Sequence, residues 1–255
     1  MPTKAIYTCI VGGYDDVLQP EVVDPSFDYL LFVPSGSRLP SSIGVWQVRE
    51  FGYLGPDATT TSRYPKMNPH LLLSQYDYTL WMDGNLSIVD RAFYDAVNVC
   101  IARGDIYAGV RHVLRDCVYD DAVSCVHAMR DDFCHIFRTV RFLLSEGFPR
   151  HYGLFENNII LRRQDPKVSA FNAMWWQLFL DYPRRDQFVA PYCLRALSLQ
   201  PTLLLPEGQS AKTSAWLRYE AHLEGPKSFW RHWYDYFACR VRTYFLIFYL
   251  RLRQR

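Results

Sequence analysis

Short apolar runs that alternate with segments of helical spacing constrain the fold of this chain more than any other feature. The runs are rich in β-branched and aromatic residues and end at Gly, Pro or Asp, which is typical of buried strands. Strands that alternate with helices form mainly parallel sheets covered on both faces, so we predict an α/β fold with a mainly parallel mixed sheet flanked by helices. The predicted strands are residues 5–11, 29–33, 45–48, 78–82, 106–110, 155–161 and 202–205, and the predicted helices are 70–73, 91–103, 116–146, 168–180, 186–198 and 229 onwards.

Composition narrows the functional classes. The net charge of +2 is too small to indicate a nucleic-acid partner, and 49% apolar residues are enough for a sizeable core. Seven Cys without a CxxC pair form neither a disulfide framework nor a zinc motif, which fits a reducing cytoplasm. The first 13 residues resemble a strand more than a signal peptide, so we expect a cytoplasmic protein. The 16% aromatic content suits sugar stacking, a membrane interface or simply a large core.

The run 78–82 ends on Asp83-Gly84-Asn85. In open α/β sheets, ligands gather at the carboxyl ends of the strands. Asp83 and Asn85 are alternate residues, so both side chains can reach one hard divalent cation, with a diphosphate supplying further oxygens. The same residues also fit an ordinary Asp-Gly turn.

A glycine-bearing segment, residues 11–16, follows the first strand. Gly12 allows the backbone to approach a ligand, Tyr14 is suited to stack on a base, and Asp15 or Asp16 is suited to bind a ribose or a uracil edge. The spacing is not GxGxxG, so a dinucleotide-binding fold is disfavoured. The alternative is a tight turn with a solvated acidic cap.

Arg63 and Lys66 lie three residues apart and therefore share one helical face. Two such cations suit a diphosphate, although a solvated basic face is the common alternative.

Polar residues interrupt the apolar strand 155–161 at Glu156, Asn157 and Asn158. Such violations of a buried pattern cluster at functional sites. Further along, Arg185-Asp186-Gln187 open a predicted helix, where Asp186 and Gln187 can face sugar hydroxyls or simply complement the helix dipole. A further polar cluster, His112, Arg115 and Asp116, follows the strand 106–110.

Taken together, these segments resemble a glycosyltransferase-like domain family found in plant mucilage- and pectin-related proteins and in bacterial polysaccharide loci. The matching segments are YTCIVGGYDD, SRYPK with NPH, YDYTLWMDGN, HVLRDCVYDDA, GLFENNIILRR, and WW followed by RRDQ, in order from about residue 6 to residue 190. The resemblance implies a GT-A-type fold and a nucleotide-sugar donor. From the residue patterns we predict that the donor is bound by Val11, Gly12, Tyr14, Asp15, Arg63, Lys66, Asp83, Gly84, Asn157 and Arg185.

The chain is also distantly similar to glycosyltransferase family 8. This similarity assigns Asp83 and Asn85 to a Mn²⁺ or Mg²⁺ site, with His222 as a further candidate ligand, and matches Asn157 to an Asn-bearing strand. Asp186 and Gln187 match a later Asp-Gln pair. Asn85 stands where an acid is usual, which weakens metal affinity and questions strict metal dependence.

Residues 228–255 carry ten aromatic residues, six Arg and one acid. Arg and aromatics alternate along a predicted amphipathic helix, which is typical of a segment in a membrane interface. A helix docked on the domain and an oligomer contact are the alternatives. We therefore predict one domain, residues 1–227, followed by a tail that associates peripherally with an anionic membrane surface.

The predicted function is sugar transfer from a UDP-sugar to a glycan or glycolipid during synthesis of a cell-surface polysaccharide such as lipopolysaccharide, O-antigen or capsule. Glu156 or Asp186, with Gln187, would act near the reacting carbon, and inversion or retention stays open. The alternatives are a nucleotidyl- or phosphotransferase and a carbohydrate-binding or scaffold protein.

Overall fold

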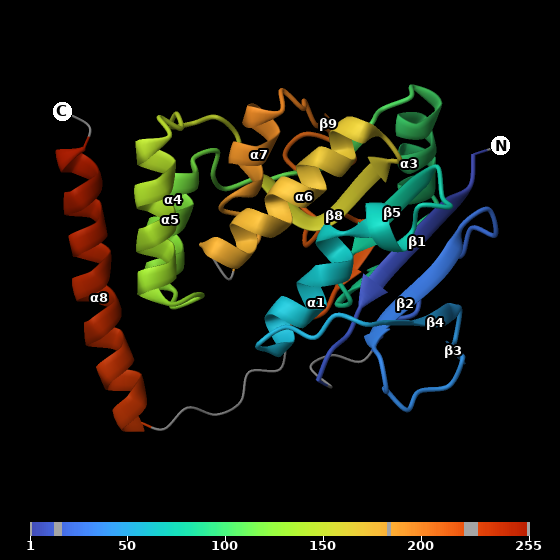
Figure 1. Ribbon diagram of the computed structural model, residues 1–255, viewed down its shortest axis with the longest axis horizontal. Helices are drawn as coiled ribbons and strands as arrows, with labels where there is room; N and C mark the ends of the chain where they lie inside the picture. The colour runs from blue at the N-terminus through green and yellow to red at the C-terminus, as the bar shows by residue number, and fades with distance from the viewer. Residues whose placement is uncertain (1, 13–16, 183–184, 222–228, 254–255) are drawn as a thin grey trace.

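The computed structural model describes residues 2–12, 17–182, 185–221 and 229–253. A sheet of eight strands runs in the order β3-β4-β2-β1-β5-β8-β7-β9. Helices cover it, and a further group of helices, which ends in α8, lies to its left in Figure 1. The strands are β1 (Lys4–Cys9), β2 (Asp28–Pro34), β3 (Ser42–Ile43), β4 (Trp46–Phe51), β5 (Tyr78–Met82), β6 (Leu86–Ile88), β7 (Tyr107–Arg111), β8 (Phe155–Arg163), β9 (Thr202–Leu203) and β10 (Leu217–Tyr219). The helices are α1 (Ala58–Met67), α2 (Pro69–Leu72), α3 (Ala92–Ala102), α4 (Val118–His127), α5 (Phe133–Ser145), α6 (Pro166–Asp181), α7 (Ala190–Ala196) and α8 (Phe229–Leu252).

The predicted mainly parallel mixed sheet is confirmed. Strands β4, β2, β1 and β5 pair in parallel, whereas β8 is antiparallel to both of its neighbours, β5 and β7. A separate antiparallel pair joins β6 to β10. The reversal at β8 is important for the site, because it brings the beginning of this strand to the edge at which β5 ends.

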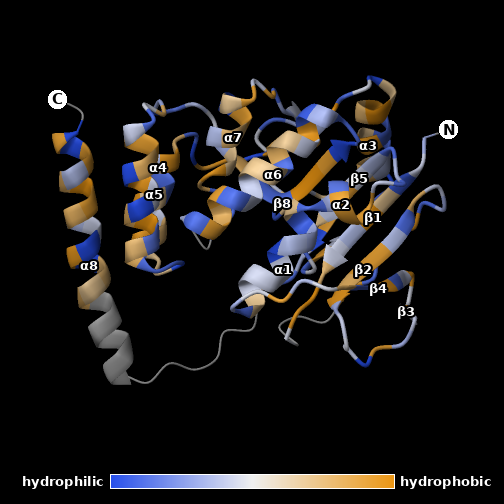
Figure 2. Ribbon diagram, viewed as in Figure 1, coloured by the Kyte–Doolittle hydropathy of each residue, from blue (hydrophilic) through white to orange (hydrophobic). Residues whose placement is uncertain are grey.

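Two apolar layers cover the two faces of the sheet. Alternation along the strands sends Ile6 and Leu80 into one layer, with α3, and Tyr7 and Trp81 into the other, with α6 and α7. Strand β5 is buried along its whole length, so both faces of this central strand are covered. Figure 2 shows the apolar colouring of the central strands and the polar colouring of many connecting segments.

Two predicted helices have different boundaries in the structure. The single helix expected over 116–146 is two helices, α4 and α5. Met129, between them, has a left-handed φ of 50°, and the carboxylate of Asp132 caps α5 by accepting from the Cys134 N–H at 2.8 Å. The helix expected from residue 186 begins at Ala190, which leaves Asp186 in the segment before α7.

Helix α8, the predicted C-terminal helix, packs against α4, and Leu246 and Leu250 complete a third apolar cluster with α4 and α5 (Figure 1). Within the described residues, no helix is both long and apolar enough to cross a membrane.

Candidate functional site

Polar residues from β5 and β8 meet at one edge of the sheet. Asp83 follows the last residue of β5, and its backbone N–H donates to the Asn158 carbonyl of β8 at 2.9 Å. Because β8 is antiparallel to β5, its first residues, which include Glu156 and Asn157, lie at this same edge. The structure therefore brings together two predicted groups that are more than 70 residues apart in the sequence.

Helix α1 brings two cations to this edge. The Lys66 ammonium lies 3.3 Å from Asp83 Oδ1 and forms a shorter ion pair with Asp186 Oδ2. Arg63 Nε lies 3.4 Å from the same Asp186 oxygen. Lys66 is only 1% exposed, whereas the side chains of Arg63 and Asp83 are about one-third exposed. The Lys66 ammonium and its ion pair with Asp186 are therefore buried, whereas solvent reaches the side chains of Arg63 and Asp83.

Burial alone would raise the pKa of Asp186, but the charges of Lys66 and Arg63, the hydrogen bond from Lys66 and the charge of Arg185 lower it below its usual value. The indole N–H of Trp175 donates to the Asp186 carbonyl at 2.8 Å and fixes this backbone segment. Asp186 is therefore a carboxylate at neutral pH. The cations of α1 hold its side chain, and Trp175 of α6 holds its backbone.

A buried guanidinium supports the position of Lys66. Arg162 on β8 is 1% exposed, and it donates to the Lys66 carbonyl at 2.7 Å and to Asn172 Oδ1 at 2.8 Å. It also donates to the Tyr7 hydroxyl of β1. Sequence reasoning missed Arg162 and Tyr7; the only signal was a charged residue at the end of an apolar strand.

Asp83 is the residue best suited to a divalent metal ion. Its Oδ1 accepts from Trp81 Nε1 at 2.7 Å, whereas no described residue donates to Oδ2. One free carboxylate oxygen on a partly exposed side chain fits a Mg²⁺ or Mn²⁺ ion whose other ligands are diphosphate oxygens and water. Asn85 is 7% exposed, and its amide N–H donates to the Glu220 carbonyl at 3.1 Å, which ties the turn to the end of β10.

The start of β8 contains polar atoms that lack partners. Asn157 is 5% exposed, and its Nδ2 has no hydrogen-bond acceptor among the described residues. Asn158 donates to Glu156 Oε2 at 3.2 Å, but within the part of the chain that the structure describes nothing donates to its own buried Oδ1. The Ala211 N–H also donates to Glu156 Oε2, at 3.2 Å. Buried polar groups are nearly always satisfied, so water or a polar ligand is expected to bond to these atoms.

A second polar cluster lies beyond β7. Gln187 donates to the buried carboxylate of Asp121 at 3.5 Å, and Arg115 lies 3.2 Å from the other oxygen of that group. Burial lowers the pKa of His112, and its Nδ1 accepts from the Arg115 N–H at 3.0 Å, so its other ring nitrogen carries the proton. Sequence reasoning named His112 and Arg115 but missed Asp121, which lies inside α4. Asp116, in contrast, pairs with His151 at 2.8 Å, away from this cluster.

The remaining predicted residues are placed in part. Gly12 has a left-handed φ of 75°, which an L side chain rarely adopts, and its Cα faces the start of α1 at Ala58. Gly84 lies against Thr8 at the end of β1, and the buried Thr8 hydroxyl has no partner among the described residues. Arg185 is half-buried, and its Nε has no hydrogen-bond partner among the described residues. The predicted residues Tyr14, Asp15, Asp16 and His222 lie outside the described residues.

A separate group of possible metal ligands lies at the start of α4 and in the loop after α5. Cys117, Asp120 and His151 place one ligand atom each within 4.8 Å of one another. However, Arg150 lies 3.3 Å from Asp120, and Asp116 holds His151. This group is distinct from the predicted Asp83 and Asn85 site.

The fold is that of an α/β protein, and a cluster of charged side chains lies at the carboxyl edge of its central strand. The chain matches the TOD1/MUCI70 glycosyltransferase-like domain over residues 4–207, and it belongs to this family. Family membership confirms the resemblance inferred from the sequence motifs.

A curated relative and two solved structures are similar to the chain. It is 23% identical to the "Probable hexosyltransferase MUCI70" of Arabidopsis thaliana over 205 residues, covering 71% of this chain and 35% of the relative. The chain thus spans about a third of that relative's length. An apo structure of the bifunctional glycosyltransferase WbbM has a TM-score of 0.43 at 13% identity, covering 94% of this chain and 44% of that one. An apo structure of mouse xyloside xylosyltransferase 1 has a TM-score of 0.41 at 9% identity, covering 79% of this chain and 83% of that one.

Proposed function

We propose that this protein transfers a sugar from a UDP-sugar to a hydroxyl of a glycan or glycolipid. The observation that carries the proposal is the convergence at one edge of the sheet of Lys66, Asp83 and Asn157, whose amide nitrogen has no acceptor among the described residues. A sugar nucleotide combines a diphosphate, which needs cations, with hydroxyls, which need hydrogen-bond partners. Membership of a glycosyltransferase-like family supports the same conclusion.

The donor's diphosphate would lie near Arg63, the more exposed of the two α1 cations, with the Lys66 charge beneath it. Val11 and Gly12 would face the nucleotide with their backbone, because Gly12 has no side chain and adopts a left-handed φ of 75°. Tyr14 and Asp15 would bind the base and ribose, and Arg185, Gly84 and Asn157 would border the sugar.

The reaction breaks the bond between the anomeric carbon and the diphosphate oxygen, which leaves with the electron pair. A bond forms between the anomeric carbon and the acceptor oxygen, and the acceptor hydroxyl loses its proton. Glu156 suits a base better than Asp186: one of its oxygens, Oε1, has no donor among the described residues, whereas two cations bind Asp186 and lower its pKa. We assign to Asp186 and Gln187 the role of positioning the cations and the acceptor.

Asp83 would hold a Mn²⁺ or Mg²⁺ ion through Oδ2, with Asn85 and His222 as further candidates. Such an ion supplies positive charge to the departing diphosphate. The ammonium of Lys66, 3.3 Å from Asp83, supplies charge at the same place, so we expect the metal to enhance catalysis without being its sole source of charge.

The acceptor would be a lipid-linked precursor of a cell-surface polysaccharide of the lipopolysaccharide, O-antigen or capsule kind. The transferase domain, residues 1–227, would then work in the cytoplasm at the inner face of a membrane, with residues 228–255 as its peripheral attachment. The basic and aromatic composition of α8 supports this placement.

Thermal unfolding of the purified chain with a panel of nucleoside diphosphates, each with and without Mn²⁺, tests the proposal. Ligands that bind the native state raise the melting temperature by mass action. We expect UDP to give the largest shift, and Mn²⁺ to increase it. Stabilisation by glycans with no response to any nucleotide would support a carbohydrate-binding or scaffold protein instead, and a product that retains phosphate would support a nucleotidyl- or phosphotransferase.

A further inference from the structure

Helix α8 exposes a continuous row of apolar side chains. Phe237, Val241, Tyr244, Phe248 and Leu252 are 54–69% exposed. They are spaced four, three, four and four residues apart, so they form one stripe along a single face of the helix. We call these five residues the α8 stripe.

The stripe is not the face that attaches α8 to the domain. Cys239, Thr243, Leu246 and Leu250 are buried, and the last two pack among the apolar residues of α4 and α5. These residues recur at spacings of four, three and four and lie on the opposite side of the helix from the stripe. Because the buried face already attaches α8 to the domain, an exposed apolar stripe of this size indicates a surface that binds a further partner.

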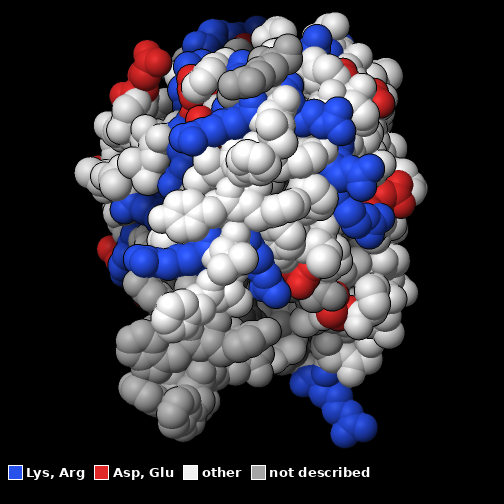
Figure 3. Space-filling view, turned by 90° about the vertical axis from the view of Figure 1, so that its left-hand side faces the viewer, with Lys and Arg blue, Asp and Glu red and all other residues white. Residues whose placement is uncertain are grey.

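The charges beside the stripe indicate what binds. Arg240, Arg242, Arg251 and Arg253 are all exposed, and no acidic residue occurs from residue 237 to residue 253. By helical spacing, Arg240 and Arg251 border the stripe on one side, and Arg242 and Arg253 lie on the other. Figure 3 views the molecule from the side on which α8 lies and shows Lys and Arg side chains spread around uncharged surface.

We propose that the α8 stripe inserts into the interface of an anionic phospholipid bilayer, with α8 lying parallel to the membrane plane. An apolar face flanked by arginines matches the acyl boundary and the phosphate layer of such a surface at the same time. This inference rests on the membrane association included in the proposed function and deepens it by naming the face of α8 that inserts.

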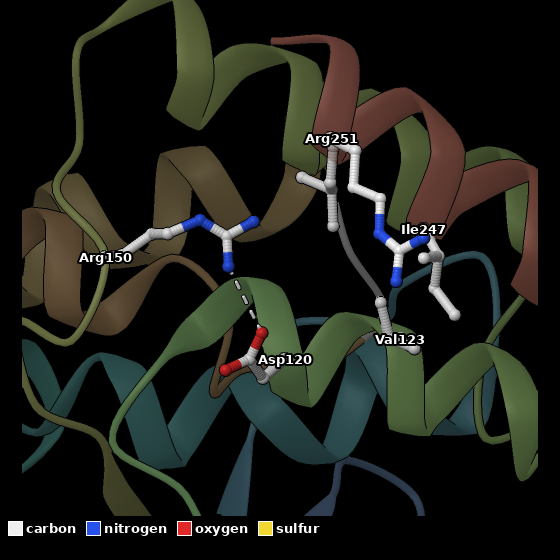
Figure 4. A pocket seen from close by; sticks show the side chains of 6 residues that line it. Asp120, Val123, Arg150, Ile247 and Arg251 are labelled. Atoms are coloured by element: carbon white, nitrogen blue, oxygen red, sulfur yellow. Dashed lines mark hydrogen bonds and ion pairs between the residues drawn. The ribbon is translucent and has the colours of Figure 1, made fainter. Parts of the chain in front are cut away.

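A pocket beside the stripe fits a lipid phosphate. It lies between α4 and α8 and has a volume of about 250 Å³, with Val123, Ile247 and Leu250 as apolar lining. Arg150 enters it from the loop after α5 and Arg251 enters it from α8 (Figure 4). Asp120 pairs with Arg150 at 3.3 Å, whereas Arg251 has no ion-pair partner among the described residues. A guanidinium in such a place binds a phosphate through two parallel hydrogen bonds.

Self-association explains the surface less well. A twofold contact through the stripe would bring the flanking arginines of two copies close together, with no acid on this part of the helix to pair with them. Like charges across an interface oppose its formation.

Vesicle co-sedimentation of the full chain tests the proposal. Wild type should bind vesicles of 70% phosphatidylcholine and 30% phosphatidylglycerol, and bind vesicles of pure phosphatidylcholine at least about tenfold more weakly. The triple variant Phe237→Ser, Tyr244→Ser, Phe248→Ser should lose at least about tenfold in affinity, because insertion scales with apolar area. A matched control, Leu54→Ser, Leu71→Ser, Leu114→Ser, removes three side chains of similar exposure (61–78% against 60–68%) elsewhere in the chain and should bind like wild type.

Equal binding by the stripe variant and wild type would overturn the proposal. So would an absence of vesicle binding combined with a dimer in light scattering that the stripe variant abolishes, because the occupant would then be a second copy. Arg251→Lys keeps the charge but loses the planar fork, so it should weaken binding more than Arg253→Lys does. If the two variants weakened vesicle binding equally, the pocket would not be part of the lipid-binding surface. UDP-induced stabilisation, measured without vesicles, reports separately on the proposed transferase function.

Discussion

The ammonium group of Lys66 and the carboxylate of Asp186 form an ion pair beneath the site, where the Lys66 side chain is 1% exposed and that of Asp186 is 12% exposed. Two elements far apart in the sequence, α1 and the segment before α7, are thereby joined. The pair also sets the electrostatics of the edge, because Lys66 lies 3.3 Å from Asp83 as well.

Removal of one partner of this pair should destabilise the protein strongly. Lys66→Met leaves Asp186 as a buried carboxylate without its main counterion, and we expect a loss of about 3–5 kcal/mol in the free energy of unfolding. Urea denaturation measures this loss. The double variant Lys66→Met, Asp186→Leu should be more stable than the single one, since no buried charge is left. If the single variant lost less than about 1 kcal/mol, the pair would have no structural role.

Acid should weaken the protein in part through Asp186. Its pKa is lowered in the folded state, so its contribution to stability is fully present above the unfolded pKa of about 4 and is lost as the pH falls through the lower folded value. Urea denaturation between pH 3 and pH 6 should show a steeper fall in stability for wild type than for Asp186→Asn. Parallel curves for the two proteins would contradict the assigned shift.

Asp83→Ala should abolish the additional UDP stabilisation that Mn²⁺ provides while leaving part of the metal-free response, because Lys66 and Arg63 stay in place. The transfer rate should fall at least about a hundredfold. Asp95→Asn, at an exposed position on α3, is the control and should behave like wild type. If Mn²⁺ increased the UDP stabilisation of Asp83→Ala as much as that of wild type, the metal would bind at another group of residues, such as Cys117, Asp120 and His151.

Asn157→Ala should separate stability from activity. The variant removes a buried amide nitrogen that has no partner among the described residues, so stability should stay within about 1 kcal/mol of wild type. Transfer should fall at least about tenfold, because the substrate loses the amide N–H that would donate to it. Denaturation and initial rates, measured on one preparation, test both parts. A large loss of stability would show that the amide serves the fold.

The sequence predicted the local parts of the site well. The buried run before Asp83 was predicted as a strand, which β5 confirms. The spacing of Arg63 and Lys66 suited one helical face, although α1 itself was not among the predicted helices. Polar residues within the apolar strand β8 marked Glu156 and Asn157 as unusual. Each of these signals lies within about ten residues of sequence.

Long-range contacts were not predictable in the same way. The hydrogen bond between Arg162 and Tyr7 joins residues that are 155 positions apart, and no local pattern indicates it. The buried role of Asp121 depends on Arg115 and Gln187 meeting it from other segments. The break between α4 and α5 depends on the left-handed Met129, a conformation that residue preferences argue against.

The most direct test of the central claim is the release of UDP from a panel of UDP-sugars by the purified full chain with Mn²⁺, in the presence and absence of glycan acceptors. We predict that one donor sugar gives release above background, that an acceptor hydroxyl increases it, and that Asp83→Ala loses it. A folded protein that neither binds UDP nor releases it from any donor would contradict the account.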